Sequence, residues 1–196
     1  MKRELLLLVT LMLLTNVTAR PGGIDNLGNN GCACHGGSDE EVTIEVTGLP
    51  SEYNSGISYN VTILISSPVQ SFTDVEGGMR ILFNHGEVTT NDLQLIDDGW
   101  TQLNSTNDRR IWNLTWNAPE EDDLLVEIIV HGNTVNGDNT TDGDMWSSIG
   151  ISIPGPSYTG EVTDIDVNHE LDTMEVIAGA MALTLLFILA YFAVRD

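Results

Sequence analysis

The sequence predicts an all-β protein, an immunoglobulin-like antiparallel β-sandwich, with a cleaved signal peptide before it and one transmembrane helix after it. Three observations lead to this prediction. The chain starts with an apolar leader, has nineteen uncharged residues close to its C-terminus, and shows short alternating runs separated by turn residues between Glu40 and Ile153. Helical periodicity is absent from that middle part, which favours strands throughout.

The N-terminus has the features of a secretory signal peptide. Lys2 and Arg3 precede the apolar run 5–14, and Val17 and Ala19 supply the small residues of a cleavage site. The run is well short of the roughly 20 residues that a bilayer requires, which disfavours an N-terminal anchor. We therefore expect residues 1–19 to be removed.

The C-terminus has the features of a membrane anchor. Residues 176–194 carry no charge, and as a helix they would extend about 28 Å, close to the roughly 30 Å of the hydrocarbon core. Tyr191 suits an interfacial position, and Arg195 suits the cytoplasmic side. We expect a transmembrane helix over 174–194, a cytoplasmic tail of residues 195–196, and a single-pass protein of the cell membrane with its N-terminal domain extracellular.

The charge of the chain is strongly negative. Its formal net charge is −22, which becomes −23 when Lys2, Arg3 and Glu4 leave with the leader, and no other lysine is present. Such a surface repels phosphates, which excludes nucleic acid as a partner. The part outside the membrane has about 150 residues, enough for one domain with a core.

The alternating runs predict strands and assign their faces. In one run Trp112, Leu114 and Trp116 share a face, which places Asn113 on the solvent side, and the same alternation places Asn60 outward. We expect seven strands, at 41–47, 59–66, 79–83, 93–96, 110–116, 124–130 and 146–153. The resulting organisation is an N-terminal segment 20–38, a sandwich 39–153 and an acidic stalk 154–173.

Four sequons follow the leader and agree with an exported chain. We expect glycans at the asparagines of these sequons, which are Asn60, Asn104, Asn113 and Asn139.

Several motifs, in order, resemble those of reeler-type extracellular domains, and specifically the membrane-anchored microbial proteins called choice-of-anchor V. They are the Gly31–His35, Gly56–Tyr59, Glu76–Ile81, Arg109–Trp112, Trp116–Pro119, His131–Gly137 and Asp144–Trp146 segments. Met79 stands where the family usually has Phe, and Cys-x-Cys-His stands where many relatives have Cys-x-x-Cys-His. The acidic composition and single-helix anchor are similar to archaeal versions. The resemblance implies a reeler-type sandwich.

The cluster Cys32-Ala33-Cys34-His35 is where the sequence suggests chemistry, and three interpretations are open. Cys32 and Cys34 could attach haem c with His35 as an axial ligand, although the spacing is one residue shorter than usual. They could instead have a structural role, either as a strained disulfide outside the cell or as free thiols. With His35 they could bind a transition metal such as copper or zinc.

Haem would need a sixth ligand or an open site, for which His85 and His131 are the best candidates and Met79 and Met145 are weaker ones. For each of them a structural histidine is the simpler interpretation.

The acidic loop 137–144 could hold Ca²⁺ through Asp138, Asp142 and Asp144, although it lacks the spacing of an EF-hand and is more simply explained as a surface turn. The sequence offers no nucleophile, base and acid set, so we expect no enzyme.

Two functions from different classes therefore stand. The first is a cell-surface binding or interaction module whose partner is an extracellular protein or glycan. The second is an electron-transfer or metal-binding module that uses Cys32, Cys34 and His35 and serves a redox partner.

Overall fold

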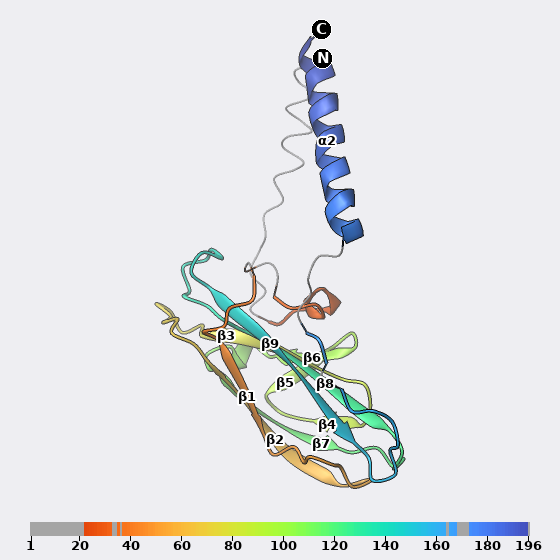
Figure 1. The fold of residues 1–196 in the computed structure, drawn as a ribbon. Coiled ribbons are helices and arrows are strands. Elements are labelled where there is room, and N and C mark those ends of the chain that lie inside the picture. Colours follow the sequence, from red (N-terminus) through yellow and green to blue (C-terminus); the bar gives the residue numbers. More distant parts are fainter. Residues whose placement is uncertain (1–21, 33–34, 36, 164, 168–172, 196) are drawn as a thin grey trace. The chain divides into compact units, whose positions relative to one another are not determined.

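The computed structural model describes residues 22–32, 35, 37–163, 165–167 and 173–195 (Figure 1). The expected signal peptide, 1–19, lies outside these residues, and so does Cys34. The chain divides into two compact units, one spanning residues 19–169 and the other containing the helix α2.

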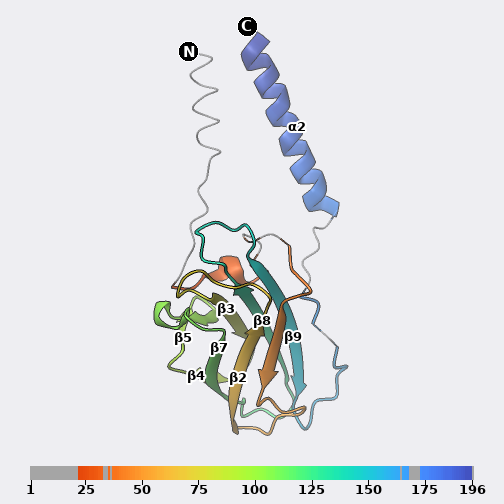
Figure 2. The same ribbon diagram turned by 90° about the vertical axis from the view of Figure 1, so that its left-hand side faces the viewer.

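The first unit is built on two antiparallel sheets, which confirms the expected all-β class (Figures 1 and 2). Sheet A has the strand order β1-β2-β7-β4, and sheet B has the order β5-β6-β3-β8-β9. The strands are β1 (Thr43–Thr47), β2 (Ser58–Ser66), β3 (Gly77–Phe83), β4 (Glu87–Thr89), β5 (Leu93–Ile96), β6 (Gly99–Gln102), β7 (Ile111–Asn117), β8 (Leu125–Thr134) and β9 (Met145–Pro154).

All seven expected strands are present, six of them with one or both ends shifted, and two further strands were missed. β4 is three residues long, too short for an alternation to be recognised. β6 follows β5 after a two-residue turn at Asp97 and Asp98, where Asp97 has a φ of 54°. Two carboxylates at such a turn suggest a break in structure, although they connect a tight hairpin.

The core lies between the sheets and follows the alternation of the sequence. Trp112 and Trp116 of β7 and Ile63 of β2 are fully buried. The register Ile63↔Trp112 and Val61↔Leu114 confirms the faces that the sequence assigned to these two strands. Burial of each such side chain contributes about 1.5–3 kcal/mol.

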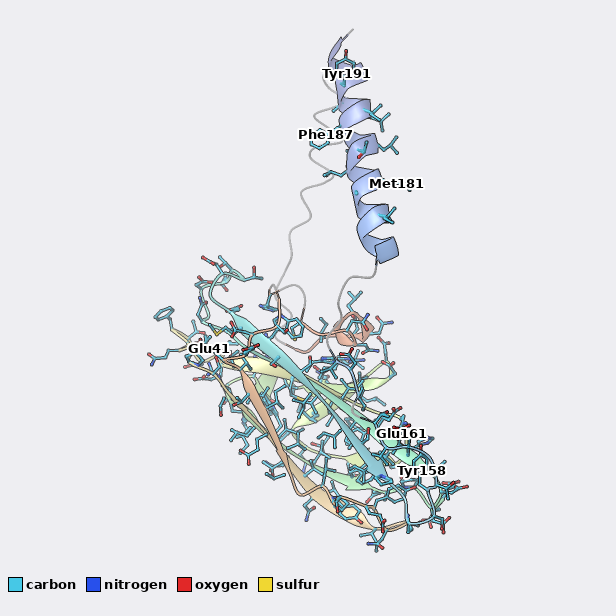
Figure 3. The ribbon with its side chains drawn as sticks, viewed as in Figure 1. Glu41, Tyr158, Glu161, Met181, Phe187 and Tyr191 are labelled. Carbon is cyan, nitrogen blue, oxygen red and sulfur yellow. The ribbon has the colours of Figure 1, made fainter. Side chains whose placement is uncertain are left out.

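The outer face of sheet B is covered as well. The N-terminal segment, residues 22–32, lies across it, and further along β9 the hydroxyl of Ser152 donates to the Thr163 carbonyl while Ile165 lies against Gly150. Consequently five consecutive residues of β3, Gly77 to Ile81, are buried rather than alternate ones. The two ends of the sandwich are marked by Glu41 on one side and by Tyr158 and Glu161 on the other (Figure 3).

The second unit contains α2 (Thr173–Arg195). Its described side chains, those of residues 177–191, are almost all exposed, including Met181 and Phe187 at 66% and 69% (Figure 3). Within the residues that the structure describes, none of the helices combines the length and the apolar character needed to cross a membrane.

Candidate functional site

The N-terminal segment crosses all five strands of sheet B and so carries its C-terminal end to the β8–β9 loop. It begins beside β5, where the Gln94 amide donates to the Gly22 carbonyl over 2.6 Å. It then passes β6, where the Ile24 N–H donates to Thr101 Oγ1 over 3.3 Å. At β9, Gly31 has a φ of +99° and a Cβ there would lie 2.4 Å from the ring of Trp146. Only glycine fits this contact.

Arg80 of β3 holds the middle of the segment. Its side chain is 1% exposed, and its Nε donates to Asn29 Oδ1 over 2.6 Å. Nη1 donates to the Ile24 carbonyl over 3.0 Å, and Nη2 donates to Asp98 Oδ1 over 2.8 Å. The guanidinium therefore joins the segment to the β5–β6 turn, and a buried charge of this kind needs such partners.

Asp98 is the counter-charge of Arg80 and is itself exposed to solvent. Its carboxylate also accepts from the Asn29 amide over 3.0 and 3.1 Å. The hydrogen bond from Asn29 is the main cause that lowers the pKa of Asp98, and the Arg80 charge acts in the same direction. The carboxylate therefore stays ionised beside the guanidinium.

His131 of β8 lies next to Arg80 and is 2% exposed. Its Nε2 is 3.0 Å from the Asn29 carbonyl, which only accepts, so Nε2 carries the proton and Nδ1 accepts from the Ser148 hydroxyl. Burial lowers the pKa of His131 and the Arg80 charge adds to this, while the bond to Asn29 opposes it. With both nitrogens engaged, His131 has none to offer as a haem ligand, and the structure gives it a positioning role.

His35 docks on the β8–β9 loop. Its Nδ1 lies 2.9 Å from Asp144 Oδ2, and the Asp144 side chain is 2% exposed. The other carboxylate oxygen accepts from the Asn136 N–H over 2.9 Å. A carboxylate on Nδ1 fixes the tautomer in which Nε2 bears the lone pair, the usual arrangement of a histidine that ligates a metal.

Of the two cysteines the structure describes Cys32, which is half-buried. Its carbonyl accepts from the His35 N–H over 2.8 Å, which places these two residues side by side. Cys32 and His35 thus lie where the N-terminal segment leaves sheet B.

In the acidic loop 137–144, carboxylates are used in hydrogen bonds to neighbouring protein groups. Asp138 Oδ1 accepts from the N–H and the hydroxyl of Thr140, both over 2.8 Å, and the bond to the N–H is the main cause that lowers the pKa of Asp138. Asp144 is engaged by His35, and Asp142 does not join the other two. Among the described residues, no three acidic, histidine or cysteine side chains converge on a point where a metal ion could sit.

His85 is distant from this region. It follows β3, and its carbonyl accepts from the Trp116 indole over 3.2 Å, at the end of the sandwich where β8 begins. The length of β3, about 20 Å, separates it from the end where His35 docks. Met79, a weaker candidate as a haem ligand, is 3% exposed in the core. The structure therefore brings neither of them to His35.

The sequon asparagines lie at the surface. Asn60 and Asn113 project from the outer face of sheet A, Asn104 opens a 3-10 turn, and Asn139 lies in the acidic loop with a φ of 65°. All four are exposed, as the predicted glycan positions require.

The sequence did not reveal the polar network around Arg80. The one available signal was a charged residue inside the otherwise uncharged strand Gly77–Phe83, in a chain with only seven Lys and Arg residues. Its partners Asn29 and Asp98 lie 51 and 18 positions away, and no local pattern connects them.

No protein-family model matches the chain, and no curated protein matches it. In structure it is similar to the Reelin-N domain of F-spondin, with 18% identity and a TM-score of 0.44 over 66% of this chain and 94% of that one. It is also similar to a lipoprotein from Bacteroides thetaiotaomicron, with 13% identity and a TM-score of 0.40 over 69% and 90% of the two chains.

A third similar structure is AggA, the major subunit of aggregative adherence fimbriae type I from Escherichia coli, with 11% identity and a TM-score of 0.35 over 60% and 94%. At this level of identity and superposition the likenesses do not establish a family, and membership of the reeler group stays a prediction.

Proposed function

We propose that the protein is a cell-surface, single-pass membrane protein that displays its β-sandwich as an extracellular binding or interaction module. The observation that carries this proposal is α2. Its described side chains include Phe187, Leu189 and Tyr191, which are 69%, 59% and 56% exposed. Apolar side chains left uncovered on a helix favour an apolar environment. The described residues alone do not make up a membrane span, but the whole uncharged run 176–194 of the sequence, as a helix, would extend about 28 Å, close to the thickness of the hydrocarbon core.

The sandwich itself supports a display role. It has its own core, the N-terminal segment is tied down on sheet B, and a polar stretch of sequence lies between β9 and α2. The expectation that the protein is not an enzyme is part of this proposal.

The test is fractionation and surface proteolysis of cells that make the full-length chain. We expect the chain in the membrane fraction, resistant to carbonate extraction, with the sandwich digested by protease added to intact cells. Leu185→Arg together with Leu189→Arg should release it from the membrane. Leu27→Arg should not, although Leu27 of the sandwich unit is more exposed than either of them, at 71% against 57% and 59%. Recovery of the wild-type chain in the soluble cytosolic fraction would contradict the proposal.

A second function is favoured by the His35–Asp144 pair. We infer that His35 Nε2, with Cys32 and Cys34 beside it in sequence, is the position at which a haem or a transition metal would be held. The buried carboxylate orients the imidazole, and thiolates with imidazole suit such a centre.

This second function is tested by absorbance and metal analysis of protein purified from its native host. The expected result is a haem band or one metal ion per chain, lost in His35→Ala and weakened about 10–100-fold in metal affinity by Asp144→Asn. His85→Ala is the control and should change nothing. A colourless and metal-free protein would reject the cofactor and leave the display role intact.

A further inference from the structure

Two of the sequons meet on the outer face of sheet A. β2 and β7 pair in a register that sets Asn60 opposite Thr115 and Thr62 opposite Asn113. Each asparagine is therefore opposite the threonine of the other sequon, because the strands are antiparallel and each sequon places its threonine two residues after its asparagine.

The side chains are joined across the strands. The Thr115 hydroxyl donates to Asn60 Oδ1 over 3.1 Å, and the Thr62 hydroxyl donates to Asn113 Oδ1 over 2.9 Å. One step further along, the Ser58 hydroxyl donates to Asn117 Oδ1 over 2.6 Å. These three cross-strand pairs form a polar ladder without a charged member, on a chain with 29 Asp and Glu residues.

The ladder bonds use the carbonyl oxygens of the Asn60 and Asn113 side chains and do not use their amide nitrogens. Within the described part of the chain, Asn60 Nδ2 makes no hydrogen bond, and Asn113 Nδ2 has a single contact, 3.5 Å long, to Asp92 Oδ2. Nδ2 is the atom to which an N-linked glycan is attached, and the attachment leaves one N–H and the carbonyl oxygen in place. A glycan on either asparagine is thus compatible with the folded ladder.

We propose that Asn60 and Asn113 both carry N-linked glycans on the same molecule, and that the folding of β2 against β7 sets these glycans side by side. Diagonal positions of neighbouring strands are about 7–8 Å apart, enough for two sugar stems to leave the sheet together. The outer face of sheet A is then a glycan-covered face. This inference rests on the proposed function, since a glycan of this kind requires the sandwich to be outside the cell.

The ladder contains its own control. Asn117 has the same cross-strand bond as the other two asparagines, but it is followed by Ala118 and Pro119 and is no sequon. Asn104 and Asn139 are sequons outside the ladder and report independently whether the chain meets the glycosylation machinery.

The experiment is intact-mass spectrometry and glycopeptide mapping of the full-length chain from membranes of its native host. We expect Asn60→Gln and Asn113→Gln each to remove one glycan mass, the double variant to remove two, and Asn117→Gln to remove none. Thr62→Val should remove the glycan at Asn60 without changing that asparagine, and Thr62→Ser should keep it. This pair guards against a glutamine variant that fails to fold.

Each outcome decides the inference. Both glycans on one molecule support it. A glycan at Asn104 or Asn139 with Asn60 and Asn113 bare overturns it while the extracellular display stands. Asn60 and Asn113 occupied only on separate molecules also overturns it. A sandwich found on the cytoplasmic side overturns the inference and the proposed function together.

Discussion

The outer faces of the two sheets differ in what lies on them. On sheet A the ladder side chains of β2 and β7 face solvent and, apart from the long contact of Asn113 with Asp92, bond to one another, whereas on sheet B the corresponding side chains are covered by the N-terminal segment and bond to it. The same alternation of strands thus yields a free surface on one side and a second buried layer on the other. The alternation of apolar and polar residues in the strands therefore does not predict which outer face of this sandwich is available to a partner.

The largest effect should come from Arg80. Arg80→Ala removes the donors that serve Asn29, Asp98 and the Ile24 carbonyl, and it leaves those groups unsatisfied under the segment. We expect the free energy of unfolding to fall by about 3 kcal/mol, measured by urea denaturation of the detergent-solubilised chain.

Arg109→Ala is the matched control for Arg80. Arg109 pairs with the adjacent Asp108 at the surface, with 41% and 53% of the two side chains exposed. Exposed pairs of this kind contribute little, so the loss should stay below about 1 kcal/mol. Equal losses of unfolding free energy for Arg80→Ala and Arg109→Ala would contradict the prediction that the buried bonds of Arg80 fasten the N-terminal segment to sheet B.

A smaller effect should follow from Gly31→Ala. The substitution places a Cβ against the Trp146 ring and adds strain at a φ of +99°, so the end of the segment should lift from β9. We expect a loss of about 2 kcal/mol and faster cleavage near residue 31 in limited proteolysis.

Gly37 supplies the comparison for Gly31. A Cβ at that position meets no atom within 4 Å. Gly37→Ala should therefore change stability by less than about 0.5 kcal/mol and leave the proteolysis pattern unchanged. If both variants behave alike, the contact with Trp146 does not fasten the segment.

The pH dependence of stability should come partly from His131, the buried histidine beneath the segment. Burial lowers its pKa, so as the pH falls below about 6.5 the unfolded chain takes up a proton that the folded chain does not. Stability should therefore decrease as the pH falls through about 6.5 and level off once the folded form is also protonated. Urea midpoints between pH 7.5 and 5 would show it.

In the His131→Asn variant this part of the pH dependence should disappear, although the variant is less stable overall. His85→Asn serves as the control, since His85 lies at the other end of the sandwich. A wild-type curve that is flat over this range, or one that His131→Asn leaves unchanged, would contradict the expectation.

The contrast between the faces also explains how much of the fold the sequence could predict. In β2 and β7 one face is buried and the other solvated, so alternation gave the two strands, their buried faces and the outward position of Asn60 and Asn113 correctly. In β3 both faces are buried, which hides the period, and the role of Arg80 depends on Asn29, 51 positions away.

The candidate site shows the same limit. The Cys-x-Cys-His pattern drew attention to His35, but its partner Asp144 is 109 positions away, in a loop that the sequence suggested for calcium. Residue types could not reveal that Asp138 and Asp144 are used by Thr140, Asn136 and His35. Local chemistry was predictable, whereas contacts made by chain folding back over a sheet were not.

The smallest effect should come from the ladder of sheet A. Ser58→Ala removes the hydroxyl that donates to Asn117 over 2.6 Å, without touching a sequon or the core. Both side chains are open to water, which replaces the lost bond, so the free energy of unfolding should change by about 0.5 kcal/mol or less. Ser148→Ala is the counterpart on sheet B: it removes a hydroxyl that donates to buried His131, where solvent is excluded, and should cost about 1–3 kcal/mol. Should the two serine variants lose the same stability in urea denaturation, the ladder would contribute to the fold as much as the buried contacts of sheet B do, and the contrast drawn between the two faces would be wrong.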